Sequence, residues 1–83
     1  MRTITITPSN AWQLACDGNK NMLLQLVSGA AGFCISDTQP AADAPFHPMP
    51  AGVLIPVTKP TKIWVRSTRH FKHDTEIMAS ETE

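Results

Sequence analysis

Apolar and polar side chains alternate along several short stretches of this chain, a period typical of β-strands with one buried face. In the first half the alternation predicts strands at Thr3–Thr7, Ala11–Cys16 and Gly32–Ser36. Met22–Val27 is apolar on both faces apart from Gln25, and Gly29 follows soon after it. It therefore predicts a central strand, with a short helix as the alternative.

Between Ala51 and Arg69, apolar and polar side chains alternate in two separate stretches. This pattern predicts two strands, Val53–Thr58 and Lys62–Ser67, joined as a hairpin at residues 59–61. The side chains expected to face the core are Val53, Ile55, Val57, Ile63 and Val65, and those expected to face outward are Lys62, Trp64 and Arg66. A weak last strand is expected at Thr75–Ala79, followed by a frayed acidic tail at residues 80–83.

Between these halves lies a proline-rich segment, residues 38–50, which we call the arm. Four of the seven prolines of the chain stand there: Pro40, Pro45, Pro48 and Pro50. Proline fixes φ and donates no hydrogen bond, so the arm is expected to be a long, stiff surface loop. Such a backbone loses little entropy when it binds a partner.

These elements predict an all-β fold: a small antiparallel β-sandwich or barrel of about seven short strands with a long Pro-rich loop. The 83 residues form a single β domain, residues 1–83.

Composition narrows the possible functions. The formal net charge is 0, which argues against a general nucleic-acid or membrane-surface binder and favours self-association. No secretion signal and no apolar run of about 18 residues is visible, so synthesis in the cytoplasm and no membrane span are expected. Cys16 and Cys34 are expected to be free, buried thiols, with one inter-strand disulfide as the alternative.

The segment 59–73 holds five basic residues and no acid: Lys59, Lys62, Arg66, Arg69 and Lys72. With Trp64 and Phe71 between them, they suit an OB-like module that binds single-stranded nucleic acid. The simpler interpretation, which we favour, is a solvated strand face whose charges pair with nearby acids.

Catalytic patterns are missing from the sequence. It contains no G-x-S-x-G elbow, no glycine-rich phosphate loop and no H-E-x-x-H motif. His70, His73 and Asp74 form H-x-x-H-D, but in a predicted turn, where ordinary surface histidines are expected. We expect no enzymatic activity, no cofactor and no metal.

Apolar side chains on the second strand faces exceed what a small domain exposes singly. Phe46 and Met49 on the arm, and Trp64 on a basic strand face, suit anchors of a protein interface. The alternative places Trp64 as a cap on the end of the core.

The segment from Ile35 to Arg69 contains P-A-G-V-L-I-P-V followed by K-I-W-V-R-S, and the positions that matter are Gly52, Ile55, Ile63, Trp64 and Arg66. With this pattern the segment resembles small β-sandwich virion proteins of tailed bacteriophages. The resemblance implies a non-enzymatic structural role in the virion, as a capsid decoration or cementing protein or a tail accessory, present in many copies.

On this reading the partners are other virion proteins, coat or tail subunits, and the chain forms a homo-oligomer. The expected partner-binding residues are Phe46, Met49, Lys62, Trp64, Arg66 and Arg69.

Overall fold

The structure of the chain is a computed structural model that describes residues 3–68 and 75–82. Within these residues there are eight β-strands and no helix, so none is present that is long and apolar enough to cross a membrane. The strands are β1 (Thr3–Ile6), β2 (Gln13–Cys16), β3 (Met22–Ser28), β4 (Ala31–Ile35), β5 (His47–Pro48), β6 (Leu54–Val57), β7 (Ile63–Ser67) and β8 (Glu76–Glu81). The all-β prediction is confirmed.

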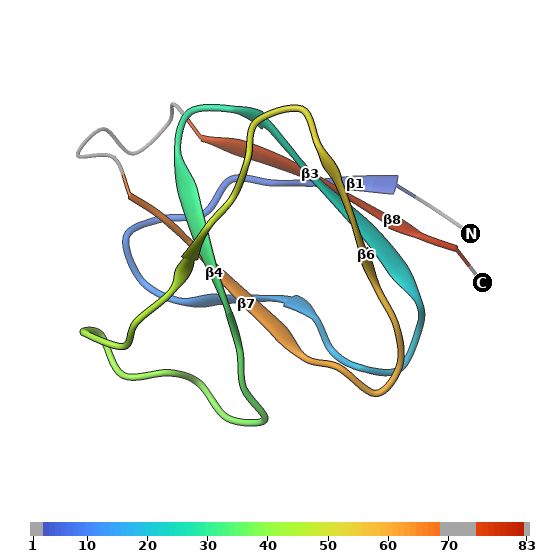
Figure 1. Ribbon diagram of the computed structural model, residues 1–83, viewed down its shortest axis with the longest axis horizontal. Helices are drawn as coiled ribbons and strands as arrows, with labels where there is room; N and C mark the ends of the chain where they lie inside the picture. Colours follow the sequence, from blue (N-terminus) through green and yellow to red (C-terminus); the bar gives the residue numbers. More distant parts are fainter. Residues whose placement is uncertain (1–2, 69–74, 83) are drawn as a thin grey trace.

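The strands form two antiparallel sheets of four strands each, which makes the fold a sandwich. The first sheet has the order β1-β8-β3-β6 and the second β2-β7-β4-β5. Figure 1 shows β6 lying beside β3, while β7 lies beside β4. β3 is an inner strand, as its apolar composition predicts, because it pairs with both β8 and β6.

The core lies between the sheets and is built from alternate residues of the inner strands. Leu24, Val65 and Ile77 come from three different strands, and each is at most 1% exposed. Cys16 is fully buried with them. Burial of such side chains contributes roughly 25 cal/mol per Å² of apolar surface removed from water, which is the main force holding this small domain together.

A polar contact also joins the two sheets. Ser67 Oγ and Thr75 Oγ1 are completely buried and lie 3.0 Å apart, and Thr75 Oγ1 also donates to the Ala30 carbonyl at 3.1 Å. Buried hydroxyls cost free energy unless they are hydrogen-bonded, and here they are.

The predicted hairpin between residues 53 and 67 is wrong. β6 pairs with β3 in one sheet, and β7 pairs with β2 and β4 in the other. The turn at 58–61, closed by the Thr61 N–H donating to the Thr58 carbonyl at 3.0 Å, therefore carries the chain from one sheet to the other. Alternation shows that two segments are strands, but a hairpin and a sheet-to-sheet crossing have the same period of two.

The inward positions of this region are partly confirmed. Ile63, Val65 and Val57 are buried and Ile55 is half-buried, but Val53 precedes β6 and is 50% exposed. The tail expected at residues 80–83 is instead strand through Glu81, because β8 lies between β1 and β3.

Two turns pack closely where the sandwich ends. Gly18 has φ +85°, and a Cβ there would stand 2.7 Å from the Pro60 carbonyl oxygen. Only glycine fits both the backbone conformation and the space. The turn after β2 is thereby held against the turn between β6 and β7.

Candidate functional site

The first part of the arm, residues 38–46, lies on the outer face of the second sheet, and side chains in or next to that sheet hold it there, while residues 47–48 form β5 and join the sheet as its edge strand. Trp12 Nε1 donates to the Ala41 carbonyl at 2.9 Å, and Arg66 Nη1 donates to the Ala42 carbonyl at 2.7 Å. Just before the arm, Trp64 Nε1 donates to the Ser36 carbonyl at 3.0 Å. The arm is the green loop at the lower left of Figure 1. The backbone of a proline-rich loop has carbonyls without strand partners, and the donors from Trp12 and Arg66 satisfy two of them.

Aromatic rings and a guanidinium fill the space under the arm. The rings of Trp12 and Phe46 meet edge to face, with centroids 6.3 Å apart. The Arg66 guanidinium lies 5.6 Å from the Trp12 ring centroid and 5.9 Å from that of Phe46. This is the geometry of a cation–π contact. Arg66 Nε is buried and has no acceptor among the described residues.

The predicted partner-binding residues take different positions. Trp64 and Arg66 are both half-buried, and Arg66 donates to the arm, so the arm and the outward strand face, predicted as separate surfaces, contact each other. Lys62 is half-buried. Met49 is 6% exposed and belongs to the core, where its main-chain N–H donates to the Ala31 carbonyl at 2.9 Å. Phe46 remains 42% exposed.

Arg69 lies outside the described residues, as do His70, Phe71, Lys72, His73 and Asp74. The end of the basic segment, residues 69–73, and the H-x-x-H-D motif therefore lie outside the described residues. In the part of the chain that the structure describes, no three His, Cys, Asp or Glu side chains gather as a metal site would require.

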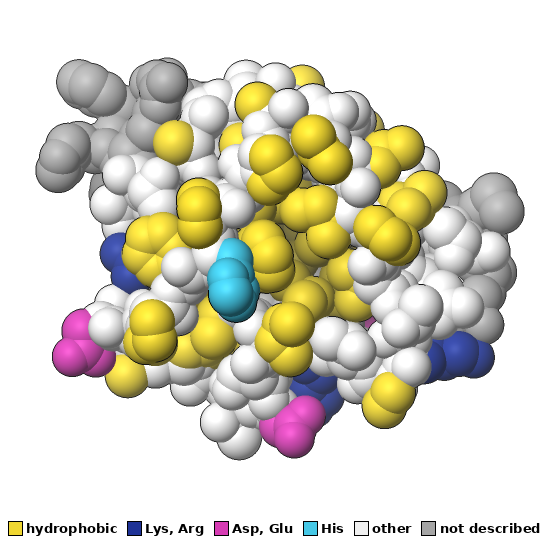
Figure 2. All heavy atoms as spheres, viewed as in Figure 1, with side chains coloured by type: hydrophobic (Ala, Val, Ile, Leu, Met, Phe, Trp, Pro, Cys, Tyr) yellow, Lys and Arg dark blue, Asp and Glu magenta, His cyan; other side chains and the backbone are white. Residues whose placement is uncertain are grey.

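Exposed apolar side chains gather around β4, the arm and β6, and we call this surface the β4–β6 face. Its exposed members are Ile35 (62%), Leu54 (57%), Val53 (50%) and Phe46 (42%). Ile35 and Phe46 line a pocket of about 310 Å³ together with Cys34, Pro45 and His47. Figure 2 views this side and shows hydrophobic side chains around the cyan imidazole of His47, the single histidine of the described residues. Charged side chains lie toward the margins of this view.

Sequence reasoning found only part of this face. It named Phe46 as an interface anchor but did not single out Leu54. It missed Ile35, at the end of a strand, and it placed Val53 in the core. A signal for Ile35 does exist, since Ser36 and Asp37 follow it directly and end the strand.

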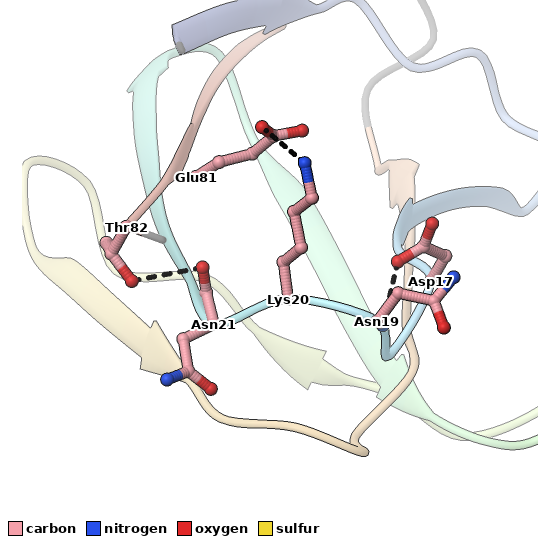
Figure 3. Close-up of polar contacts among 6 residues, drawn as sticks. All are labelled: Asp17, Asn19, Lys20, Asn21, Glu81 and Thr82. Carbon is pink, nitrogen blue, oxygen red and sulfur yellow. Dashed lines mark hydrogen bonds and ion pairs between the residues drawn. The ribbon is translucent and has the colours of Figure 1, made fainter. Parts of the chain in front are cut away.

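A second pocket, of about 340 Å³, lies where β1 and β2 form the edges of the two sheets. Ile4 and Leu14 line it, and each is 40% exposed. Lys20 and Glu81 also line it and form an ion pair, with Nζ and Oε2 3.2 Å apart (Figure 3).

The turn beside this second pocket affects two titratable groups. The Asn19 N–H donates to Asp17 Oδ1 at 2.9 Å, and this bond lowers the pKa of the Asp17 carboxyl (Figure 3). Burial raises the pKa of the Cys16 thiol to about 11, and the Asp17 carboxylate adds to the rise. At neutral pH this thiol is protonated and therefore a poor nucleophile. Both cysteines are free, as predicted, with Cys16 buried and Cys34 half-buried.

Compared with known proteins, the chain matches no family, no curated protein and no solved structure. Its function must therefore be inferred from its own surfaces.

Proposed function

We propose that this chain is a non-enzymatic structural protein of a phage particle, a capsid decoration or cementing subunit that binds other virion proteins through the β4–β6 face. The observation that supports the proposal is the exposure of Ile35 and Phe46 at one pocket, together with the exposure of Val53 and Leu54 at β6. Large apolar side chains gathered on one side are typical of surfaces that a protein partner covers.

The sheets and the arm that carry the β4–β6 face are suited to binding a partner without rearrangement. The two sheets fix Ile35 and Leu54, and hydrogen bonds to Trp12 and Arg66 hold the arm that carries Phe46. A surface ordered before binding loses less entropy when a partner docks. The chain is proposed to act in the virion after synthesis in the host cytoplasm, as a homo-oligomer, with no cofactor and no membrane partner.

The alternative is the OB-like nucleic-acid module that uses residues 59–73. No described contact favours it, since the two described residues best suited to bind a nucleotide, Trp64 and Arg66, already contact the arm and the segment before it. Titration with a labelled single-stranded oligonucleotide at low salt tests it. Binding that weakens by orders of magnitude at moderate salt would support the alternative and contradict our proposal.

The proposal is tested on density-gradient-purified phage particles produced in the presence of a tagged copy of the chain. We expect the wild-type chain to sediment with particles, as measured by mass spectrometry of the particle band. Ile35→Lys and Leu54→Lys each place a charge in the proposed interface and should reduce the bound amount at least tenfold, which corresponds to about 1.4 kcal/mol.

Thr58→Lys is the matched control, because it adds the same charge at an exposed position in the turn after β6. It should bind as the wild type does. If the wild-type chain is absent from the particles, or if all three variants bind equally, the proposed function is wrong.

A further inference from the structure

A two-sheet sandwich has four sheet edges, and three of the four here carry features that hinder the addition of another strand. β2 has a register shift between Leu14 and Cys16 where it pairs with β7. β5 is only two residues long and includes Pro48. β6 includes Pro56, which has no N–H to donate.

The fourth edge, β1, has no such feature. Its four residues Thr3–Ile6 pair with β8 in unbroken register and contain no proline and no charge. Threonine and isoleucine are both favoured in strands. No other strand of the described residues pairs with the far side of β1, so its outward backbone groups are available for a further strand.

The sequence of β1 is complementary to itself about a two-fold axis. In an antiparallel pair, residues directly opposite each other share a face of the sheet. With Thr5 opposite Thr5 of a second copy, Ile4 lies opposite Ile6, and Thr3 lies opposite Thr7. All isoleucines then fall on the inner face and all threonines on the outer face. A slip by one residue would break this arrangement.

Apolar surface and charge both favour a second copy at this edge. Ile4 and Leu14, each 40% exposed, line the 340 Å³ pocket beside β1, and an added strand would shield Ile4 with an isoleucine. Lys20 and Glu81, which line the same pocket, already pair with each other, so two copies meet with little like-charge repulsion (Figure 3).

We propose that two copies of this chain join β1 to β1, antiparallel about a two-fold axis, so that their first sheets become one continuous sheet of eight strands. The inference builds on the homo-oligomer of the proposed function and gives it a contact and a symmetry. The β4–β6 face stays free for a virion partner, because β6 is the opposite edge of the same sheet.

The first test is sedimentation velocity of the isolated chain over a hundredfold range of concentration. We expect a dimer whose dissociation constant rises at least tenfold in Thr5→Lys, because the two substituted side chains then lie opposite each other. Thr5 is exposed, and circular dichroism will show whether the variant keeps its fold. Thr58→Lys, with the same added charge, should remain dimeric.

The second test determines the register of the β1–β1 pair by disulfide formation between two copies, in a Cys34→Ser background. Thr5→Cys should give a covalent dimer under mild oxidation, because opposite Cα atoms lie about 4.5–5.5 Å apart, within disulfide range. Thr7→Cys alone should not, since residue 7 faces residue 3 of the other copy. Cross-linking at residue 7 but not at residue 5 would overturn the proposed register.

Three results overturn the inference as a whole: a monomer at every concentration, a dimer unaffected by Thr5→Lys, or a dimer lost in Leu54→Lys instead. None of them bears on particle binding, which is measured separately. A Thr5→Lys monomer that still sediments with particles would support the β1 contact and show that particle binding does not need it.

Discussion

At the scale of single residues, Gly32 is what allows the arm to lie flat on the second sheet. It sits in β4 opposite Arg66, and a Cβ at this position would overlap the Phe46 ring. The ring therefore packs directly on the strand backbone. A glycine inside a strand costs conformational entropy, and here that cost makes room for an aromatic contact.

Gly32→Ala should lower the free energy of unfolding by about 1–3 kcal/mol, because the Phe46 ring must move away from the strand. Urea denaturation measures the change. In a Phe46→Ala background the obstacle is gone, and the same substitution should cost nothing or even stabilise the protein. An equal cost in both backgrounds would mean that the ring is not the obstacle.

At the scale of elements, the arm is fastened through its main chain. Trp12 Nε1 and Arg66 Nη1 donate to carbonyls of adjacent arm residues. Prolines limit the shapes that the arm takes, and these two donors select one of them. The sequence suggests that the arm is a free binding loop, but these two hydrogen bonds make it part of the folded domain.

Trp12→Phe should loosen the arm while keeping an aromatic ring in place. It removes the bond to the Ala41 carbonyl, worth about 0.5–1.5 kcal/mol, so cleavage beside Asp43 by an aspartate-specific protease should become several times faster. Gln13→Ala, at an exposed neighbouring position, should leave the rate unchanged. Equal rates for the two variants would contradict the role of the indole.

The strands themselves were predictable, but their pairing was not. Period-two alternation located most strands correctly, since burial of one face leaves a local pattern in the sequence, and a run that is apolar on both faces located the inner strand β3. The partner of β6 depends on contacts between distant residues, such as Leu24 opposite Ile55, which no local pattern encodes. β5 was not predicted, because its two residues are too few to show an alternation and because both lie within the proline-rich arm.

The residues of the candidate site were likewise only partly predictable from the sequence. Aromatic and proline content drew attention to Phe46 and Trp64, but composition does not show which apolar side chains stay exposed. Ile35 has the same strand context as buried isoleucines, and only its position at the open end of β4 leaves it 62% exposed.

At the scale of the whole molecule, the balance between folded and unfolded chain depends on pH through the buried Cys16. In the folded protein its pKa is raised from 9.0 to about 11. The thiol therefore ionises first in the unfolded chain. Its contribution to stability is complete below pH 9 and is lost as the pH rises through 11.

We expect the free energy of unfolding, measured with urea, to fall between pH 9 and pH 11. The fall should be shallower in Cys16→Ala, which has no thiol to ionise, while Cys34→Ala serves as the control because no comparable burial affects it. The same slope in all three proteins would exclude Cys16 as the source.

The fastening of the arm also gives the molecule a built-in optical signal. The chain has two tryptophans, and both indole N–H groups donate to carbonyls, one in the arm and one just before it. Release of the arm would expose the Trp12 indole to water and move its fluorescence to longer wavelength, and release that extends to Ser36 would do the same for Trp64. Docking of a partner over the arm would instead leave the emission in place or shift it to shorter wavelength, so unlabelled protein can report in solution whether its arm is closed.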